Sequence, residues 1–101
     1  MTRAEVEALA KNLGVHVSTH LWTETVAGVP MGPPTLRWNI SVEGMMAGYT
    51  TGTVPEAVGI DALWAAIGND LQSSVDDGRL ARAREAAKAV NAMFEGMGRR
   101  S

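Results

Sequence analysis

The stretch "TLRWNISV", residues 35–42, decides the fold that we predict for this chain of 101 residues. Leu36, Trp38, Ile40 and Val42 alternate with polar side chains, which is the period of two expected of a strand buried on one face only. An antiparallel sheet with one apolar face has to be covered by another layer. We therefore expect the rest of the chain to supply further strands and a layer of helices.

Two more strands are expected on either side of this stretch. Residues 15–24 show the same alternation of apolar and polar side chains. Gly44 can turn the chain, and residues 45–51 are then expected to return as a third strand. Gly48 lies within that strand and indicates a bulge or an edge.

Three helices are expected to cover the sheet. The first spans residues 3–13, and the second follows a capping-box spacing at Thr53 and Glu56. The third occupies most of residues 79–97 and is separated from the second by the break Asp76-Asp77-Gly78.

The whole chain, residues 1–101, is predicted to be a single α+β domain with a flexible C-terminal end over about residues 96–101. Its three-stranded antiparallel sheet is packed by helices in the order α-β-β-β-α-α. The sequence has no cysteine, which excludes disulfides and thiolate metal sites and fits a reducing compartment. No apolar run approaches the roughly 20 residues that cross a bilayer. We expect a soluble cytoplasmic protein with no membrane partner.

No set of side chains meets the requirements of catalysis or metal binding. His16 and His20 lie on a predicted strand, where four residues span about 13 Å, too far for one metal ion to bridge. No serine lies in a nucleophile elbow, and the glycines do not form a phosphate loop. We therefore expect no enzymatic activity, no metal and no cofactor.

The polar face of the sheet carries the first candidate binding residues. Trp22 and Glu24 belong to this face of the first strand, and Arg37 and Asn39 to the same face of the next. An exposed indole is typical of protein interfaces, but Trp22 could equally stack on Arg37 as a local cation–π pair. Both interpretations stay open at this point.

A long loop over residues 27–34 carries the second set of candidates. Three prolines stiffen it, and Val29 and Met31 place apolar side chains at its tip. Long loops in compact domains are usually functional or disordered, and the prolines favour a loop presented to a partner. The alternative is that the tip folds back over the sheet edge and covers Met45 and Met46.

Charge is distributed unevenly along the chain. Residues 54–78 contain five acidic and no basic side chains, whereas residues 79–101 contain six basic and two acidic ones. The carboxylates of Asp70, Asp76 and Asp77 would suit a basic groove on a partner. For the last two, a role as turn and cap residues is the simpler interpretation.

The run "LRWNISVEGMMAGYTTGTVPEAVGIDALWAAIGNDLQ", residues 36–72, resembles a pattern in small proteins of phages and mobile elements. It contains a Trp-led strand, a return strand ending in Tyr-Thr-x-Gly, a short proline linker and an Asp-x-Leu helix. With its small size and its lack of cysteine and of catalytic motifs, the chain is similar to the anti-CRISPR proteins, phage-encoded inhibitors of CRISPR–Cas surveillance complexes.

The resemblance implies a role and assigns no individual residue. It implies stoichiometric binding to a Cas protein complex of type I in the host bacterial cytoplasm, so that target DNA is neither captured nor cleaved, with no direct contact to nucleic acid. From the residues themselves, the candidate protein-binding side chains are Trp22, Glu24, Val29, Met31, Arg37, Asn39, Asp70, Asp76 and Asp77.

Two other hypotheses are kept. An α-β-β-β-α core followed by a basic helix resembles double-stranded RNA-binding domains, and Arg79, Arg82, Arg84 and Lys88 could contact phosphates, although Glu85 interrupts them. Such a chain would be a small nucleic-acid-binding module or a phage regulatory subunit. Alternatively, the alanine-rich last helix could form the seam of a homodimer.

Overall fold

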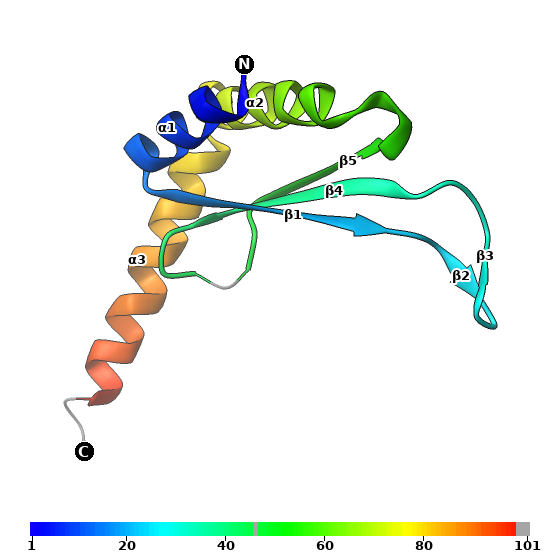
Figure 1. Cartoon of the computed structure of the whole chain (residues 1–101). Helices are drawn as coiled ribbons and strands as arrows, with labels where there is room; N and C mark the ends of the chain where they lie inside the picture. Colours follow the sequence, from blue (N-terminus) through cyan, green and yellow to red (C-terminus); the bar gives the residue numbers. More distant parts are fainter. Residues whose placement is uncertain (46, 99–101) are drawn as a thin grey trace.

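The computed structural model describes residues 1–45 and 47–98 and has the predicted α+β architecture (Figure 1). A small two-stranded hairpin is inserted into the predicted order of elements. The elements are α1 (Arg3–Leu13), β1 (Val15–Trp22), β2 (Thr25–Val26), β3 (Val29–Pro30), β4 (Thr35–Val42), β5 (Thr50–Pro55), the 3₁₀ turn η1 (Glu56–Val58), α2 (Ile60–Asp76) and α3 (Arg79–Gly98).

The main sheet is antiparallel, with the strand order β1-β4-β5. β4 lies in the centre, so that Trp38 is opposite Thr19 on one side and Gly52 on the other. α1 and α2 cover one face of this sheet and leave the other face without a helical layer (Figure 1). The core between the helices and the sheet consists of Val6, Ala10, Val15, Trp38, Ile40, Leu63, Trp64, Ile67, Leu71 and Leu80.

The first helix begins and ends as its sequence predicts. The Glu5 backbone N–H donates to Thr2 Oγ1 and the Thr2 backbone N–H donates to Glu5 Oε1, both at 3.2 Å, which is a complete capping box. The hydrogen bond from the Thr2 backbone lowers the pKa of Glu5. Gly14 ends the helix with a φ of 69°, a left-handed conformation that favours glycine.

The predicted third strand and the predicted second cap are both wrong in position. β5 spans Thr50–Pro55 instead of residues 45–51, and α2 begins at Ile60 after Gly59, without a side-chain cap. Thr53 lies within β5, opposite Arg37 of β4, so pairing of the two strands overrides its local capping signal.

Gly48 therefore lies in the loop between β4 and β5, where it allows a close approach. A Cβ atom at this position would overlap the Asn39 side chain, so the loop passes directly over that residue of β4. Gly48 was expected to mark a bulge or an edge within a strand, but it lies in a loop.

The predicted long loop over residues 27–34 is instead mostly a hairpin. β2 and β3 pair with each other, and only Ala27 and Gly28 form the turn, with φ values of 52° and 81°. Positive φ at both central residues is the geometry of two-residue hairpin turns. The Met31 N–H donates to the Glu24 carbonyl at 2.7 Å and extends the ladder.

This hairpin, which we call the arm (residues 23–34), continues the β1–β4 ribbon beyond the helices (Figure 1). Val29 and Met31 are 59% and 58% exposed, so the arm does not fold back to bury its apolar side chains. The alternative prediction was that the loop folds back over Met45 and Met46. Met46 lies outside the described residues.

The last helix projects from the opposite end of the molecule. Leu80 and Ala87 in its first half are buried, whereas Met93 and Phe94 further along are 68% and 65% exposed. The radius of gyration is 16.5 Å, against about 13 Å expected for a compact domain of this size, because both the arm and α3 extend outward. The helix continues to Gly98, and residues 99–101 of the predicted flexible end lie outside the described part of the chain.

In residues 1–45 and 47–98, none of the helices has the length and apolar character needed to span a bilayer.

Candidate macromolecule-binding face

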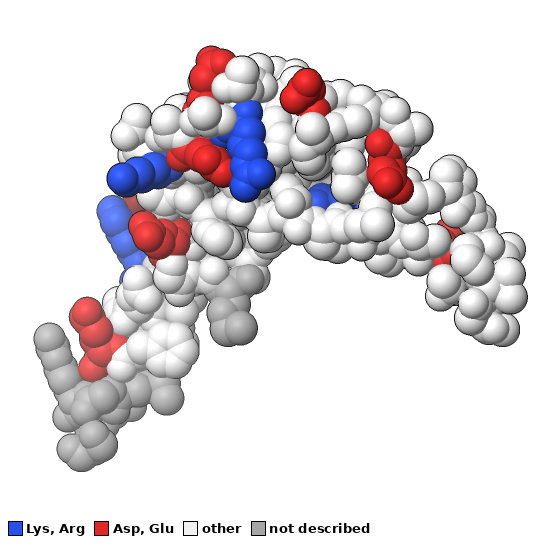
Figure 2. Space-filling model, viewed as in Figure 1, with Lys and Arg blue, Asp and Glu red and all other residues white. Residues whose placement is uncertain are grey.

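The face of the sheet opposite α1 and α2 is the main candidate surface, and we call it the open face. The molecule is arched, and its outline is hollowed below the sheet between the arm and α3 (Figure 2). The register assigns to the open face one arginine, two histidines and several small polar side chains, with no carboxylate from these three strands. Its side chains are His16, Ser18, His20, Trp22, Thr35, Arg37, Asn39, Ser41, Thr51, Thr53 and Pro55.

Trp22 and Arg37 form a stacked pair at the outer end of the open face. The Arg37 guanidinium carbon lies 3.7 Å from the centre of the indole ring, which is a close cation–π contact. Trp22 is still 37% exposed, so the prediction that it lies on the exposed polar face is confirmed together with the stack. The two interpretations of Trp22 are thus compatible, since stacking orients the ring without burying it.

Arg37 has no carboxylate partner among the described residues. No ion pair involves its guanidinium there, and its Nε atom is buried without a hydrogen-bond partner. His20 lies directly opposite it on β1, and Thr53 lies opposite it on β5. The outer end of the open face therefore offers a positive charge that the fold itself leaves uncompensated.

Six of the nine predicted binding residues lie on the open face or on the arm. Trp22, Arg37 and Asn39 lie on the open face, and Glu24, Val29 and Met31 lie on the arm that extends it. Asn39 is half-buried beneath the β4–β5 loop, and the side chains of the arm are exposed.

Asp70 lies elsewhere and bonds within the protein. Its carboxylate accepts hydrogen bonds from Trp38 Nε1 at 2.8 Å, from Thr50 Oγ1 at 3.0 Å and from Arg79 Nη1 at 3.2 Å. Its side chain is only 17% exposed. The expectation that Asp70 presents its charge to a partner is therefore wrong, because the charge joins α2 to the sheet and to the start of α3.

Asp76 and Asp77 lie at the corner between α2 and α3. Asp77 accepts from the backbone N–H of Arg79 at 3.0 Å and from its Nε at 2.8 Å, and these bonds, the backbone one first, lower the pKa of Asp77. The interpretation of Asp77 as a turn and cap residue is confirmed. Among the described residues, Asp76 accepts only from Gln72 Nε2, at 3.3 Å, and it is exposed.

Two parts of this surface are not among the predicted binding residues. A shallow hollow across the three strands is lined in part by Ser18, His20, Thr51 and Thr53. β5 was predicted too early in the chain, so its two threonines could not be placed beside β1. The alternation of residues 15–24 was the signal that could have drawn attention to Ser18 and His20.

Residues 1–45 and 47–98 contain no group of three or more His, Asp or Glu side chains that could hold a metal ion. His16 and His20 lie four residues apart on the open face of β1, and neither has a hydrogen bond to a serine or to an acid among the described residues. The geometry defines a small α+β protein with an exposed polar and aromatic face.

Comparison with known proteins adds no relative: no family model matches the chain, and no curated protein or solved structure has significant similarity to it.

Proposed function

We propose that the chain is a binding protein without catalytic activity, which engages another protein through the open face and the arm. One observation carries this proposal: Trp22, exposed and stacked on Arg37, lies at the base of the projecting arm that carries the exposed Val29 and Met31. Tryptophan, arginine and methionine are enriched at protein interfaces, and tryptophan and arginine dominate their energetic hot spots.

Preorganisation is the physical reason why this surface suits binding. The stack holds Trp22 in place, and the two-residue turn at Ala27 and Gly28 ties the two strands of the arm together. Side chains that are already ordered lose less conformational entropy when a partner binds.

The partner that we propose is a type I CRISPR–Cas surveillance complex, and this part rests on the resemblance of residues 36–72 to the anti-CRISPR proteins. Inhibition would be stoichiometric, because a protein bound to the surface that receives target DNA excludes the DNA. The acidic charges support this step less than the sequence suggested, since Asp70 and Asp77 both pair with Arg79.

The test is capture of the purified surveillance complex by the immobilised protein, followed by a gel-shift assay with target DNA. We expect the wild-type protein to be retained and to abolish the DNA shift at a one-to-one ratio. Trp22→Ala and Met31→Asp should each weaken capture by about tenfold or more, as truncation of a hot-spot residue does. Glu85→Gln on α3, with a 76% exposed side chain, is the matched control and should bind normally.

Two results would count against the proposal. If the wild-type protein captures no Cas complex, the proposed partner is wrong. If it does so and neither substitution weakens capture, the open face and the arm are not the binding surface.

Nucleic-acid binding is the competing hypothesis, and the structure removes part of its basis. Arg79 bonds to Asp70 and Asp77, and Arg84 Nη2 donates to the Leu13 carbonyl at 2.6 Å. Two of the four basic residues of α3 are therefore used within the fold. A filter-binding titration against salt separates the hypotheses, because phosphate contacts produce a steep loss of affinity as salt rises.

A further inference from the structure

β1 is an edge strand whose outer side is available for pairing. It hydrogen-bonds to β4 on one side, and none of the other described strands pairs with it. The eight residues of β1 contain no proline, lysine, arginine or carboxylate, and their register with β4 is unbroken from Val15 to Trp22. Natural sheets usually protect long edges with charges, prolines or bulges, and β1 has none of these.

The hydrogen-bond pattern identifies which main-chain groups are free. The Glu43 N–H donates to the Gly14 carbonyl at 3.0 Å, and residues facing each other in antiparallel strands alternate between bonded and non-bonded pairs. The even-numbered residues of β1 therefore bond to β4. The N–H and C=O groups of Val15, Val17, Thr19 and Leu21 point away from it.

The other edge of the sheet differs from β1. β5 is two residues shorter, contains Gly52 and ends at Pro55, which has no N–H to donate. β1 is therefore the edge on which an added strand would form the longer ladder.

We propose that the β1 edge pairs with β1 of a second copy of this chain, antiparallel and with the two-fold axis at Ser18. In that register Val17 faces Thr19, Val15 faces Leu21, and each of these pairs exchanges two main-chain hydrogen bonds. The same pairs place apolar or hydroxyl side chains together on the helical face, which is the face of the sheet covered by α1 and α2. His16 faces His20 on the open face, so no pair opposes two fixed charges.

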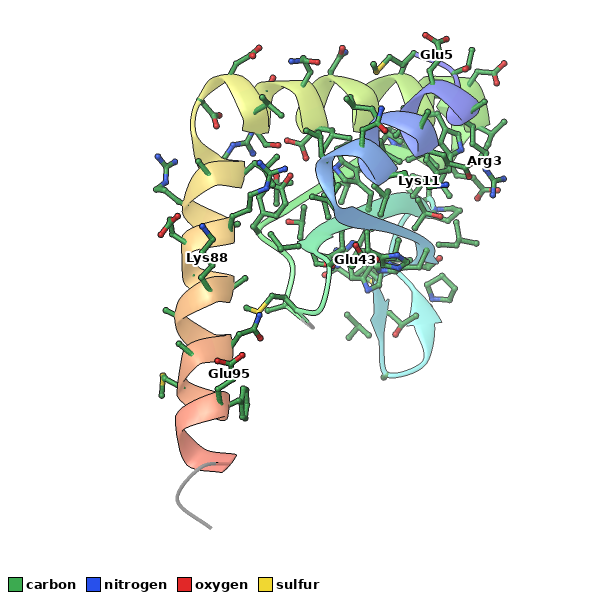
Figure 3. The ribbon with its side chains drawn as sticks, turned by 90° about the vertical axis from the view of Figure 1, so that its left-hand side faces the viewer. Arg3, Glu5, Lys11, Glu43, Lys88 and Glu95 are labelled. Carbon is green, nitrogen blue, oxygen red and sulfur yellow. The ribbon has the colours of Figure 1, made fainter. Side chains whose placement is uncertain are left out.

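A further observation favours a second copy as the occupant. Leu21 is 58% exposed on the face of the sheet that α1 and α2 cover elsewhere, and Val15 of the other copy would lie beside it. Arg3 and Lys11 on α1 and Glu43 after β4 (labelled in Figure 3) line a hollow together with residues of β1, so charges lie near the strand but none lies within it.

The resulting dimer has one continuous six-stranded sheet with both open faces on the same side. It goes beyond the proposed function, because a monomer could bind a partner through its open face equally well.

Sedimentation velocity of the full chain over a micromolar concentration series tests the proposal. We expect a monomer–dimer equilibrium for the wild-type protein. Thr19→Pro removes an outward N–H without affecting the ladder to β4, and should weaken dimerisation by about tenfold or more. Thr53→Pro is the matched control, because it removes an outward N–H from the opposite edge and should leave the dimer intact.

Circular dichroism and thermal unfolding establish that both proline variants are folded. Phe94→Ser tests the alternative dimer interface along α3, where Phe94 is 65% exposed. The proposal is overturned if the wild-type protein stays monomeric, if Thr53→Pro acts as strongly as Thr19→Pro, or if Phe94→Ser dissociates a dimer that Thr19→Pro leaves intact. Capture of a Cas complex by a monomeric wild-type protein would overturn the dimer and leave the proposed function standing.

Discussion

Replacing Asp70 by alanine tests how strongly its carboxylate stabilises the contacts of α2 with the sheet and with α3. The carboxylate joins Trp38 in the centre of the sheet, Thr50 at the start of β5 and Arg79 at the start of α3. These three partners are far apart in sequence, so the substitution removes contacts that no neighbouring residue replaces.

The magnitude follows from the burial of each partner. Trp38 is 7% exposed, and its unpaired indole N–H would cost about 1–3 kcal/mol. Thr50 is 8% exposed and keeps a bond from Arg79 Nη1 at 2.8 Å, so we expect a further loss of about 1 kcal/mol. The ion pair with Arg79, whose side chain is 31% exposed, adds about 0.5 kcal/mol after solvent screening.

The expected total is a loss of about 3 kcal/mol in the free energy of unfolding, which corresponds to a decrease of roughly 15 °C in Tm for a domain of this size. Urea unfolding followed by circular dichroism at constant pH measures it, and Asp76→Ala, which removes one exposed hydrogen bond, is the control expected to change stability by less than about 0.5 kcal/mol. A loss below about 1 kcal/mol for Asp70→Ala would refute the argument that this carboxylate is structural.

Three further predictions concern packing and pH. Gly52→Ala should destabilise the fold by about 2 kcal/mol in chemical unfolding, because its Cβ would overlap the Trp38 ring, whereas Gly96→Ala in α3 has open space and should be neutral or stabilising. The pKa of Asp77 in the folded protein is below its value in the unfolded chain, so the ionised carboxylate stabilises the fold above about pH 4, and this contribution is lost as the pH falls through the native pKa. The free energy of unfolding of Asp77→Asn should therefore depend less on pH in this range. Burial raises the pKa of Tyr49, so stability should decline above about pH 10, and a Tyr49→Phe variant should show a smaller decline over the same range.

Local sequence patterns were sufficient to predict the position of β4 and the start of α1. The alternation at residues 35–42 predicted β4 because the central strand is buried on one face along its whole length. The capping box at Thr2 and Glu5 predicted the start of α1 because the signal and the structure are both confined to one turn.

The predicted elements were misplaced where contacts between residues far apart in the sequence determine the structure. β5 has only Val54 as a large apolar residue facing the helices, and its position depends on Gly52 admitting the Trp38 ring and on Thr50 reaching Asp70. None of these contacts leaves a periodic signal. The turn at Ala27 was missed because alanine seldom adopts a positive φ, so a two-residue hairpin was not expected there.

The candidate site was predictable in its parts and not in its arrangement. Trp22 and Arg37 share a face in any antiparallel pairing with this alternation, and the structure adds that they stack. The engagement of Asp70 could not be inferred, because it requires knowledge of which residues of β5 and α3 meet the end of α2.

The arm has a practical consequence, because exposed turns that project from a folded domain are preferred sites of cleavage by proteases. Residues 12–36 contain no lysine or arginine, so trypsin has no cleavage site there, whereas Leu21 and Trp22 at the end of β1 and Met31 in the arm are exposed substrates for chymotrypsin. The rate of chymotryptic cleavage at these residues therefore reports directly on whether a ligand covers the arm and its base, before the ligand has been identified.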